Sequence, residues 1–110
     1  DFWATWCGPC IQEMDDLHEA YDKFSGDNFT ILSLSFDENR ETVEDFRESK
    51  YGMPWNHAFV ENGFNNPLAQ SYEVTGIPKP ILIGPDGTIQ AVGTQLRGKQ
   101  LAKTLEKYLR

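Results

Sequence analysis

The two cysteines of the chain, Cys7 and Cys10, lie in the run WCGPC at residues 6–10. Two thiols at this spacing can ligate a metal, form a structural disulfide or carry out thiol–disulfide exchange. A zinc site would need two more ligands; the histidines are His18 and His57, and His18 lies too far along the expected helix to reach the sulfurs. A structural disulfide across so short a loop would stabilise the fold only slightly. The pattern therefore favours a redox-active dithiol.

The residues around the pair favour one cysteine as the attacking group. Pro9 suits the first turn of a helix, where its missing N–H costs nothing. Cys7 then lies at the helix N-terminus, where unpaired amide groups and the macrodipole stabilise a thiolate. Cys10, one turn further along, is shielded and within reach of a mixed disulfide on Cys7. We expect Cys7 to attack a substrate disulfide and Cys10 to release the product.

Hydrophobic periodicity predicts the elements that must hold this pair in place. Apolar residues from Ile11 to Phe24, three and four positions apart, predict an amphipathic helix with its apolar stripe toward the core. Asn39 and Asp37 are candidate caps of the next helix. The expected elements are a strand ending near residue 5, a helix over about 9–25, a strand over 29–36, a helix over 40–51, a short strand at 57–60, a helix over about 66–73, hairpin strands at 81–83 and 88–92, and a helix from about 98.

The order of these elements predicts one α/β domain over residues 1–110. Strand–helix–strand alternation implies right-handed parallel crossovers, and the hairpin adds antiparallel strands. A mixed sheet with helices on both faces follows, with the dithiol at the C-terminal end of the first strand. Asp1 opens an aromatic, β-prone run without a starting Met, so we expect that residues precede it and that the domain is truncated at its N-terminus.

Composition limits the partners. The chain has 17 Asp and Glu residues against 10 Lys and Arg, a net charge of −7. Such a surface repels the phosphates of nucleic acids and anionic lipids, so we expect neither as a ligand. Its apolar runs are far shorter than the roughly 18 residues of a membrane-spanning helix.

Two motifs resemble those of the thioredoxin family. Residues 1–10, DFWATWCGPC, resemble the strand and helix start that carry the thioredoxin dithiol. Residues 74–78, VTGIP, resemble the family's second motif, a loop whose proline is cis and packs against the dithiol. The longer segment between them, with SLSFDE at 33–38, is similar to the TlpA/ResA-like branch. The resemblance covers nearly the whole chain and implies a three-layer thioredoxin-like fold with an extra helix and strand between the dithiol helix and the cis-proline loop.

The resemblance also implies roles for individual residues. Cys7 would be the nucleophile and Cys10 the resolving thiol. The backbone at Gly76, Ile77 and Pro78 would align a substrate strand by β-type pairing. These roles have a simpler alternative, in which Pro78 is an ordinary trans proline of a turn. The further residues that the resemblance assigns are Trp6, beside the nucleophile and against the substrate; Asp1, the acid beneath the dithiol; and Glu38, the glutamate of the ResA-like branch.

Two of these acids have an alternative reading. Asp1 would take the proton of Cys10 if its carboxylate is desolvated, but a frayed first residue would leave it in water. Glu38 would be a solvated loop carboxylate, or a shift of one position in the alignment would put Asp37 in its place.

The function implied is that of a thiol–disulfide oxidoreductase without metal or organic cofactor. Its partners would be a disulfide-bearing protein substrate and an upstream thiol reductant. Gly8-Pro9 is the dipeptide of reducing thioredoxins, whose potential is about −270 mV, so we expect a net reductant. The branch is bacterial and extracytoplasmic, periplasmic or tethered by an N-terminal anchor, although cytosolic thioredoxins carry the same dithiol. We expect a monomer, in which a missing upstream strand would leave a sheet edge open to dimerisation.

Two other functions stay open on the sequence. A thiol peroxidase would use Cys7 against peroxide, but peroxiredoxins have a lone peroxidatic cysteine preceded by Pro and Thr, and this run differs. A non-catalytic thioredoxin-like domain of a larger lipoprotein would keep the dithiol without using it.

Overall fold

The computed structural model describes residues 1–109, apart from the side chain of Asp27. Three short 3-10 turns, Ser25–Asp27, Gly63–Asn65 and Gly93–Leu96, separate some of the main elements. In chain order these are β1 (Phe2–Trp3), α1 (Gly8–Gln12), α2 (Met14–Phe24), β2 (Leu32–Ser35), α3 (Arg40–Ser49), β3 (Asn56–Phe59), α4 (Pro67–Ser71), β4 (Ile81–Ile83), β5 (Ile89–Val92) and α5 (Gln100–Leu109).

The strands form a mixed sheet in two parts. β1, β2 and β3 are parallel and in that order, with β2 in the middle. β4 and β5 form an antiparallel hairpin. Lys79, shortly before β4, joins the two parts. Its N–H donates to the carbonyl of Phe2 at 3.1 Å, and its carbonyl accepts from the N–H of Phe2 at 3.2 Å. The mixed topology expected from the sequence is confirmed, with α3 and β3 as the extra helix and strand.

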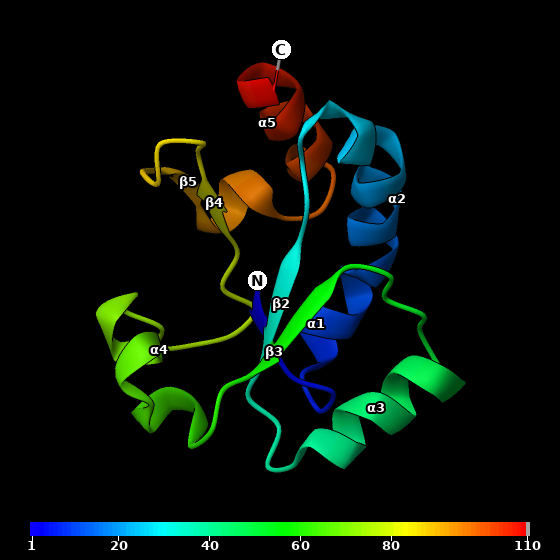
Figure 1. The fold of residues 1–110 in the computed structure, drawn as a ribbon, viewed down its shortest axis with the longest axis vertical. Helices are drawn as coiled ribbons and strands as arrows, with labels where there is room; N and C mark the ends of the chain where they lie inside the picture. The colour runs from blue at the N-terminus through cyan, green and yellow to red at the C-terminus, as the bar shows by residue number, and fades with distance from the viewer. Residues whose placement is uncertain (110) are drawn as a thin grey trace.

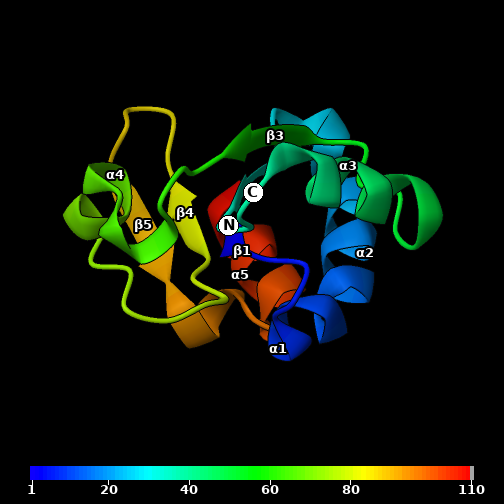
Figure 2. The ribbon, with the colours of Figure 1, turned by 90° about the horizontal axis from the view of Figure 1, so that it is seen from below.

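Helices cover both faces of the sheet, as β1 shows best. Successive side chains of a strand point to opposite faces. The ring of Phe2 lies 6.1 Å from that of Tyr72, which follows α4. The ring of Trp3 lies 5.5 Å from that of Phe46 on α3. β1 therefore lies between α4 on one face of the sheet and α1, α2 and α3 on the other (Figures 1 and 2). On that second face α5 packs beside α2.

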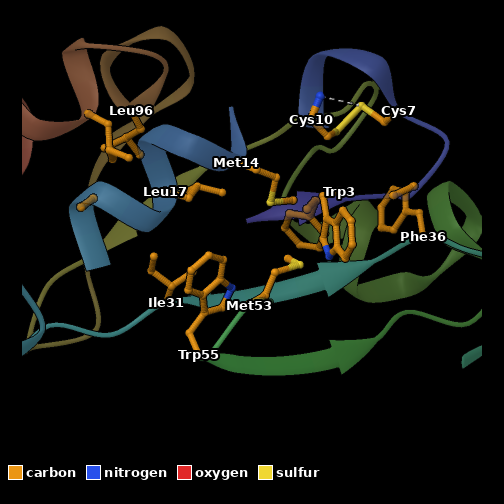
Figure 3. Packing of buried hydrophobic residues seen from close by; sticks show 14 of the residues in the cluster. Trp3, Cys7, Cys10, Met14, Leu17, Ile31, Phe36, Met53, Trp55 and Leu96 are labelled. Atoms are coloured by element: carbon orange, nitrogen blue, oxygen red, sulfur yellow. Dashed lines mark hydrogen bonds between the residues drawn. A yellow bond between two sulfur atoms is a disulfide. The ribbon is translucent and has the colours of Figure 1, made fainter. Parts of the chain in front are cut away.

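The core lies between α2 and the parallel strands. Trp3, Met14, Phe24 and Leu105 are almost completely buried, and Met53 and Trp55 close the layer from the segment that enters β3 (Figure 3). The apolar stripe expected on the first long helix is therefore confirmed as core. None of the helices among residues 1–109 is long and apolar enough to span a bilayer.

The structure differs from the expected elements in one important place. The single helix expected over about 9–25 is interrupted at Glu13, which separates α1 from α2. The N–H of Glu13 bonds the carbonyl of Cys10 at 3.3 Å, a tighter turn than that of an α-helix. The carboxylate of Glu13 pairs with Arg97, 84 positions away, so a partner distant in sequence accompanies the break. The prediction of one continuous helix was wrong.

Candidate redox site

A tight turn delivers the dithiol from β1 to α1. The N–H of Cys7 bonds the carbonyl of Ala4 at 3.2 Å, which closes a turn with Thr5 and Trp6 at its corners. Trp6 extends from this turn into solvent and is 61% exposed. The turn is thus the link between the central sheet and the first cysteine.

Cys7 is the N-cap residue of α1, as its position before Pro9 predicts. Its backbone is extended, and its Sγ accepts a hydrogen bond from the backbone N of Cys10 at 3.2 Å (Figure 3). Cys7 and Cys10 form a disulfide with their Cα atoms 5.2 Å apart. Both are buried. A sulfur in this position faces the amide end of a helix, which favours negative charge.

The second motif lies beside the strand that carries the dithiol. The Ile77–Pro78 peptide bond is cis. Lys79, the next residue, is held against Phe2 by the backbone pair that joins the two parts of the sheet. Ile77 and Pro78 are half-buried, whereas Gly76 is exposed. The loop therefore presents exposed backbone next to β1.

Asp1 extends the pairing of β1 with β2. Its backbone N donates to the carbonyl of Leu32 at 2.7 Å, and its carbonyl accepts from the N–H of Leu34 at 2.8 Å. The backbone of Asp1 is thus paired, and the residue is half-buried.

The acids after β2 lie in different surroundings. Glu38 is exposed in the loop before α3. The cap of α3 is Asn39, whose Oδ1 accepts from the N–H of Thr42 at 2.9 Å. Asp37, the other cap candidate, does not cap that helix; it is only 3% exposed and turns toward β1.

Asp37 binds the turn that leads to the dithiol. Its Oδ1 accepts from the hydroxyl of Thr5 at 2.6 Å, and both carboxylate oxygens lie within 3.2 Å of the Thr5 N–H. Its Oδ2 also accepts from the hydroxyl of Ser35 at 2.6 Å. The sequence alone indicates for Asp37 only a role as a helix cap or as a substitute for Glu38. The missed signal is that polar residues follow two neighbouring parallel strands, whose carboxyl ends meet at one edge of the sheet.

The histidines lie in an aromatic cluster at the sheet. The ring of His18 lies 5.0 Å from that of Trp55, and the ring of His57 stacks on Trp55 at 6.4 Å. A hollow of about 640 Å³ opens beside His18 and is lined by Arg47, Glu44 and Glu48 among others. Within residues 1–109, no three His, Cys, Asp or Glu side chains are grouped closely enough to hold a metal ion.

Solved structures with similar folds were found. The thioredoxin domain of a thiol-disulfide oxidoreductase from Bacteroides vulgatus superposes with a TM-score of 0.86 at 32% identity, over 100% of this chain and 76% of that one. The solution structure of a thiol:disulfide interchange protein from a Bacteroides species gives a TM-score of 0.83 at 33% identity, over 99% of this chain and 70% of that one.

Sequence relatives agree with the structural ones. A thiol-disulfide oxidoreductase ResA from Bacillus thuringiensis is 31% identical over 110 residues, 100% of this chain. The chain spans 60% of the length of that relative. A sequence model of a family described as thioredoxin-like matches residues 1–89. With this match, the dithiol at the start of α1 and the cis-proline loop beside β1, the chain belongs to the thioredoxin-like family, among relatives of the ResA kind.

Proposed function

We propose that this chain is a thiol–disulfide oxidoreductase domain that reduces protein disulfides through Cys7 and Cys10. The observation that carries the proposal is the Cys7–Cys10 disulfide at the N-terminus of α1, with the backbone N of Cys10 3.2 Å from the Sγ of Cys7. A donor at that sulfur stabilises it as a thiolate once the disulfide is reduced. The relatives named thiol-disulfide oxidoreductases support the same chemistry.

The reaction would proceed in two exchanges. The Cys7 thiolate attacks one sulfur of a substrate disulfide, forms a mixed disulfide, and expels the other sulfur as a thiolate. Cys10, after losing its proton, attacks the Cys7 sulfur of the mixed disulfide and expels the second substrate thiolate. Two electrons pass from the dithiol to the substrate, and the Cys7–Cys10 disulfide remains. An upstream dithiol then reduces that disulfide by the reverse exchanges.

The substrate would lie along the cis-proline loop. The exposed backbone at Gly76 and the half-buried Ile77 and Pro78 offer main-chain groups to an extended peptide. Trp6, 61% exposed at the turn before Cys7, offers apolar contact to the same peptide. We assign these four residues to substrate binding.

Asp1 and Glu38 would act on protons and not on bonds to sulfur. We propose that Asp1, directly before β1, accepts the proton of Cys10, and that Glu38, exposed before α3, assists the same transfer. Asp1→Asn and Glu38→Gln should then slow release of the second product near neutral pH. They should leave the first attack by Cys7 unchanged.

The direction of electron flow and the compartment are also part of the proposal. Gly8-Pro9 between the cysteines favours a reductant. The resemblance to the ResA-like branch favours a bacterial protein acting outside the cytoplasm. Its partners would be a protein disulfide and a thiol reductant, and the net charge of −7 favours substrates with a basic surface.

A redox titration tests the proposal. The protein is equilibrated in graded dithiothreitol buffers, free thiols are alkylated, and the products are counted by mass. We expect one two-electron transition near −270 mV, the potential of thioredoxin. A transition above about −180 mV, where isomerases lie, would overturn the assignment as a reductant.

Single-cysteine variants test the roles of the two thiols. Cys10→Ser should accumulate a mixed disulfide with a disulfide-bearing protein such as insulin, because the second exchange is lost. Cys7→Ser is the matched control and should form none. Equal adduct formation by both variants would contradict the assignment of Cys7 as the nucleophile.

A further inference from the structure

The side chain of Asp37 is a buried carboxylate that the proposed exchange steps do not use. It is 3% exposed and lies two residues after Ser35, the last residue of β2. The N–H of Phe36 bonds the carbonyl of Trp3 at 2.8 Å, so the backbone next to Asp37 is fixed to β1. The backbone at Asp37 is therefore held in place at the ends of β1 and β2.

The partners of this carboxylate are neutral donors. They are the N–H and hydroxyl of Thr5 and the hydroxyl of Ser35, with the two hydroxyl oxygens 2.6 Å away. The backbone N of Asp37 also donates to the hydroxyl of Ser35 at 3.0 Å. Among residues 1–109, no Lys or Arg forms an ion pair with Asp37. Burying a carboxylate without a cation is costly unless its oxygens are well hydrogen-bonded, and here they are.

Thr5 is the residue through which this carboxylate reaches the dithiol. It occupies the first corner of the turn closed by the Cys7 N–H and the Ala4 carbonyl. The backbone N–H at that corner of a turn has no partner within the turn itself. Asp37 binds that N–H and the side chain of the same residue, so it fixes the orientation of the corner.

The turn in turn sets the position of the nucleophile. Cys7 ends the turn and begins α1, and its Sγ lies 3.2 Å from the N of Cys10. Asp37 is therefore connected to Cys7 by its hydrogen bonds to Thr5 and by the short turn in which Thr5 and Cys7 lie. Resting on the proposed function, we infer that Asp37 is a positioning residue: it clamps Thr5 so that Cys7 stays within reach of Cys10 when the mixed disulfide is resolved.

The clamp predicts which step is affected. Attack of Cys7 on an external disulfide is bimolecular, so its rate does not depend on how closely Cys7 is held to Cys10 and should change little when the bond to Thr5 is lost. Resolution is intramolecular, and its rate depends on how well Cys7 and Cys10 are held together. Loss of the clamp should slow resolution and lower the effective concentration of one thiol at the other, which makes the disulfide easier to reduce.

The test uses the reduced protein and 5,5′-dithiobis(2-nitrobenzoate). Cys7 attacks this disulfide and releases one thionitrobenzoate; Cys10 then attacks the resulting mixed disulfide and releases the second. The two releases separate in stopped flow, so both steps are read in one experiment. Asp37→Ala should leave the first rate unchanged and slow the second by about tenfold or more. Its potential should rise, by about 30 mV for a tenfold loss of effective concentration.

Two variants distinguish the clamp from other roles of the residue. Asp37→Asn keeps an oxygen for Thr5 but removes the charge, so it should keep the second rate near that of the unaltered protein across the pH profile. Ser33→Ala is the matched control: Ser33, on β2, accepts a hydrogen bond from the indole N–H of Trp55 at 2.8 Å, a partner outside the turn. It should destabilise the fold without slowing the second release.

A second pair of variants serves if Asp37→Ala does not fold. Thr5→Val removes only the hydroxyl donor and should slow the second release, whereas Thr5→Ser keeps both donors and should restore it. The inference would be overturned if Asp37→Asn slowed the second release as much as Asp37→Ala does, because charge or proton transfer would then be the cause. If Asp37→Ala does not fold, the same comparison is made with Thr5→Val. Equal second rates in Thr5→Val and Thr5→Ser, or in Asp37→Ala and Ser33→Ala, would also overturn it. If the unaltered protein released only one thionitrobenzoate, the proposed function would fail and the inference with it.

Discussion

The segment that carries the dithiol is held at both ends, and the two ends are held differently. Upstream, Thr5 is bound by Asp37, whose carboxylate also accepts a hydrogen bond from Ser35; we call these three residues the upstream anchor. Downstream, Glu13 at the break between α1 and α2 is bound by Arg97; we call this pair the downstream anchor. The upstream anchor joins the segment to β2, and the downstream anchor joins it to the turn before α5.

The anchors differ most in their exposure to water. Asp37 is 3% exposed, whereas the side chains of Glu13 and Arg97 are 18% and 39% exposed. Buried hydrogen bonds to a charged group are strong and leave costly unpaired donors when one partner is removed. A partly exposed ion pair is weaker and is screened by salt. The segment is therefore held firmly next to the nucleophile and more loosely beyond Cys10.

Removing the upstream anchor should have the largest effect on stability. Asp37→Ala leaves the N–H and hydroxyl of Thr5 and the hydroxyl of Ser35 without their acceptor. We expect the free energy of unfolding to fall by about 3 kcal/mol, and by about 1 kcal/mol for Asp37→Asn, which keeps one oxygen. Urea denaturation monitored by circular dichroism measures both. Equal losses in the two variants would show that the charge, and not the hydrogen-bonded oxygens, stabilises this end.

Removing the downstream anchor should have a smaller, salt-dependent effect. Arg97→Met keeps an unbranched apolar stem but removes the charged guanidinium, and we expect a loss of about 0.5–1 kcal/mol at low ionic strength. The coupling of Arg97→Met with Glu13→Gln in a double-mutant cycle should disappear near 1 M salt, where the Debye length is about 3 Å. The effect of Asp37→Asn should hardly change over the same range. A salt-independent coupling at Glu13 would remove the contrast between the anchors.

The anchors also mark the limit of what the sequence could predict. The dithiol, its place at a helix start and the fold class follow from short patterns, because a helix cap or a strand depends on residues close together in the chain. Asp37 and Asn39 are equally good caps by that standard. Only the fold brings Thr5, 32 positions away, next to Asp37 and leaves the cap to Asn39.

The break at Glu13 was missed for the same reason. Neither Gly nor Pro lies between Cys10 and Leu17 to interrupt the apolar periodicity. The residue that binds Glu13 is Arg97, which belongs to the last part of the chain. Local propensity predicts where helices occur, but contacts between distant segments decide where this one is divided.

The smallest effect concerns pH and lies at neither anchor. Burial lowers the pKa of His57 below its usual value of 6.5; the hydrogen bond to the Met53 carbonyl opposes this shift, and the positive charge of Arg47 adds to it. Because the folded state binds the proton less well than the unfolded chain, this contribution to stability is complete above about pH 6.5 and is lost as the pH falls through the pKa of the folded protein.

His57→Gln isolates this contribution. Urea midpoints measured above and below about pH 6.5 should fall less with acidification in His57→Gln than in the unaltered protein. Asp37→Asn and Arg97→Met should retain that part of the pH dependence, because it comes from His57. An unchanged slope in His57→Gln would show that the pH dependence of stability does not come from His57. Loss of the slope in His57→Gln would show that this pH dependence comes from His57, so that the two anchors differ in their burial and in their sensitivity to salt.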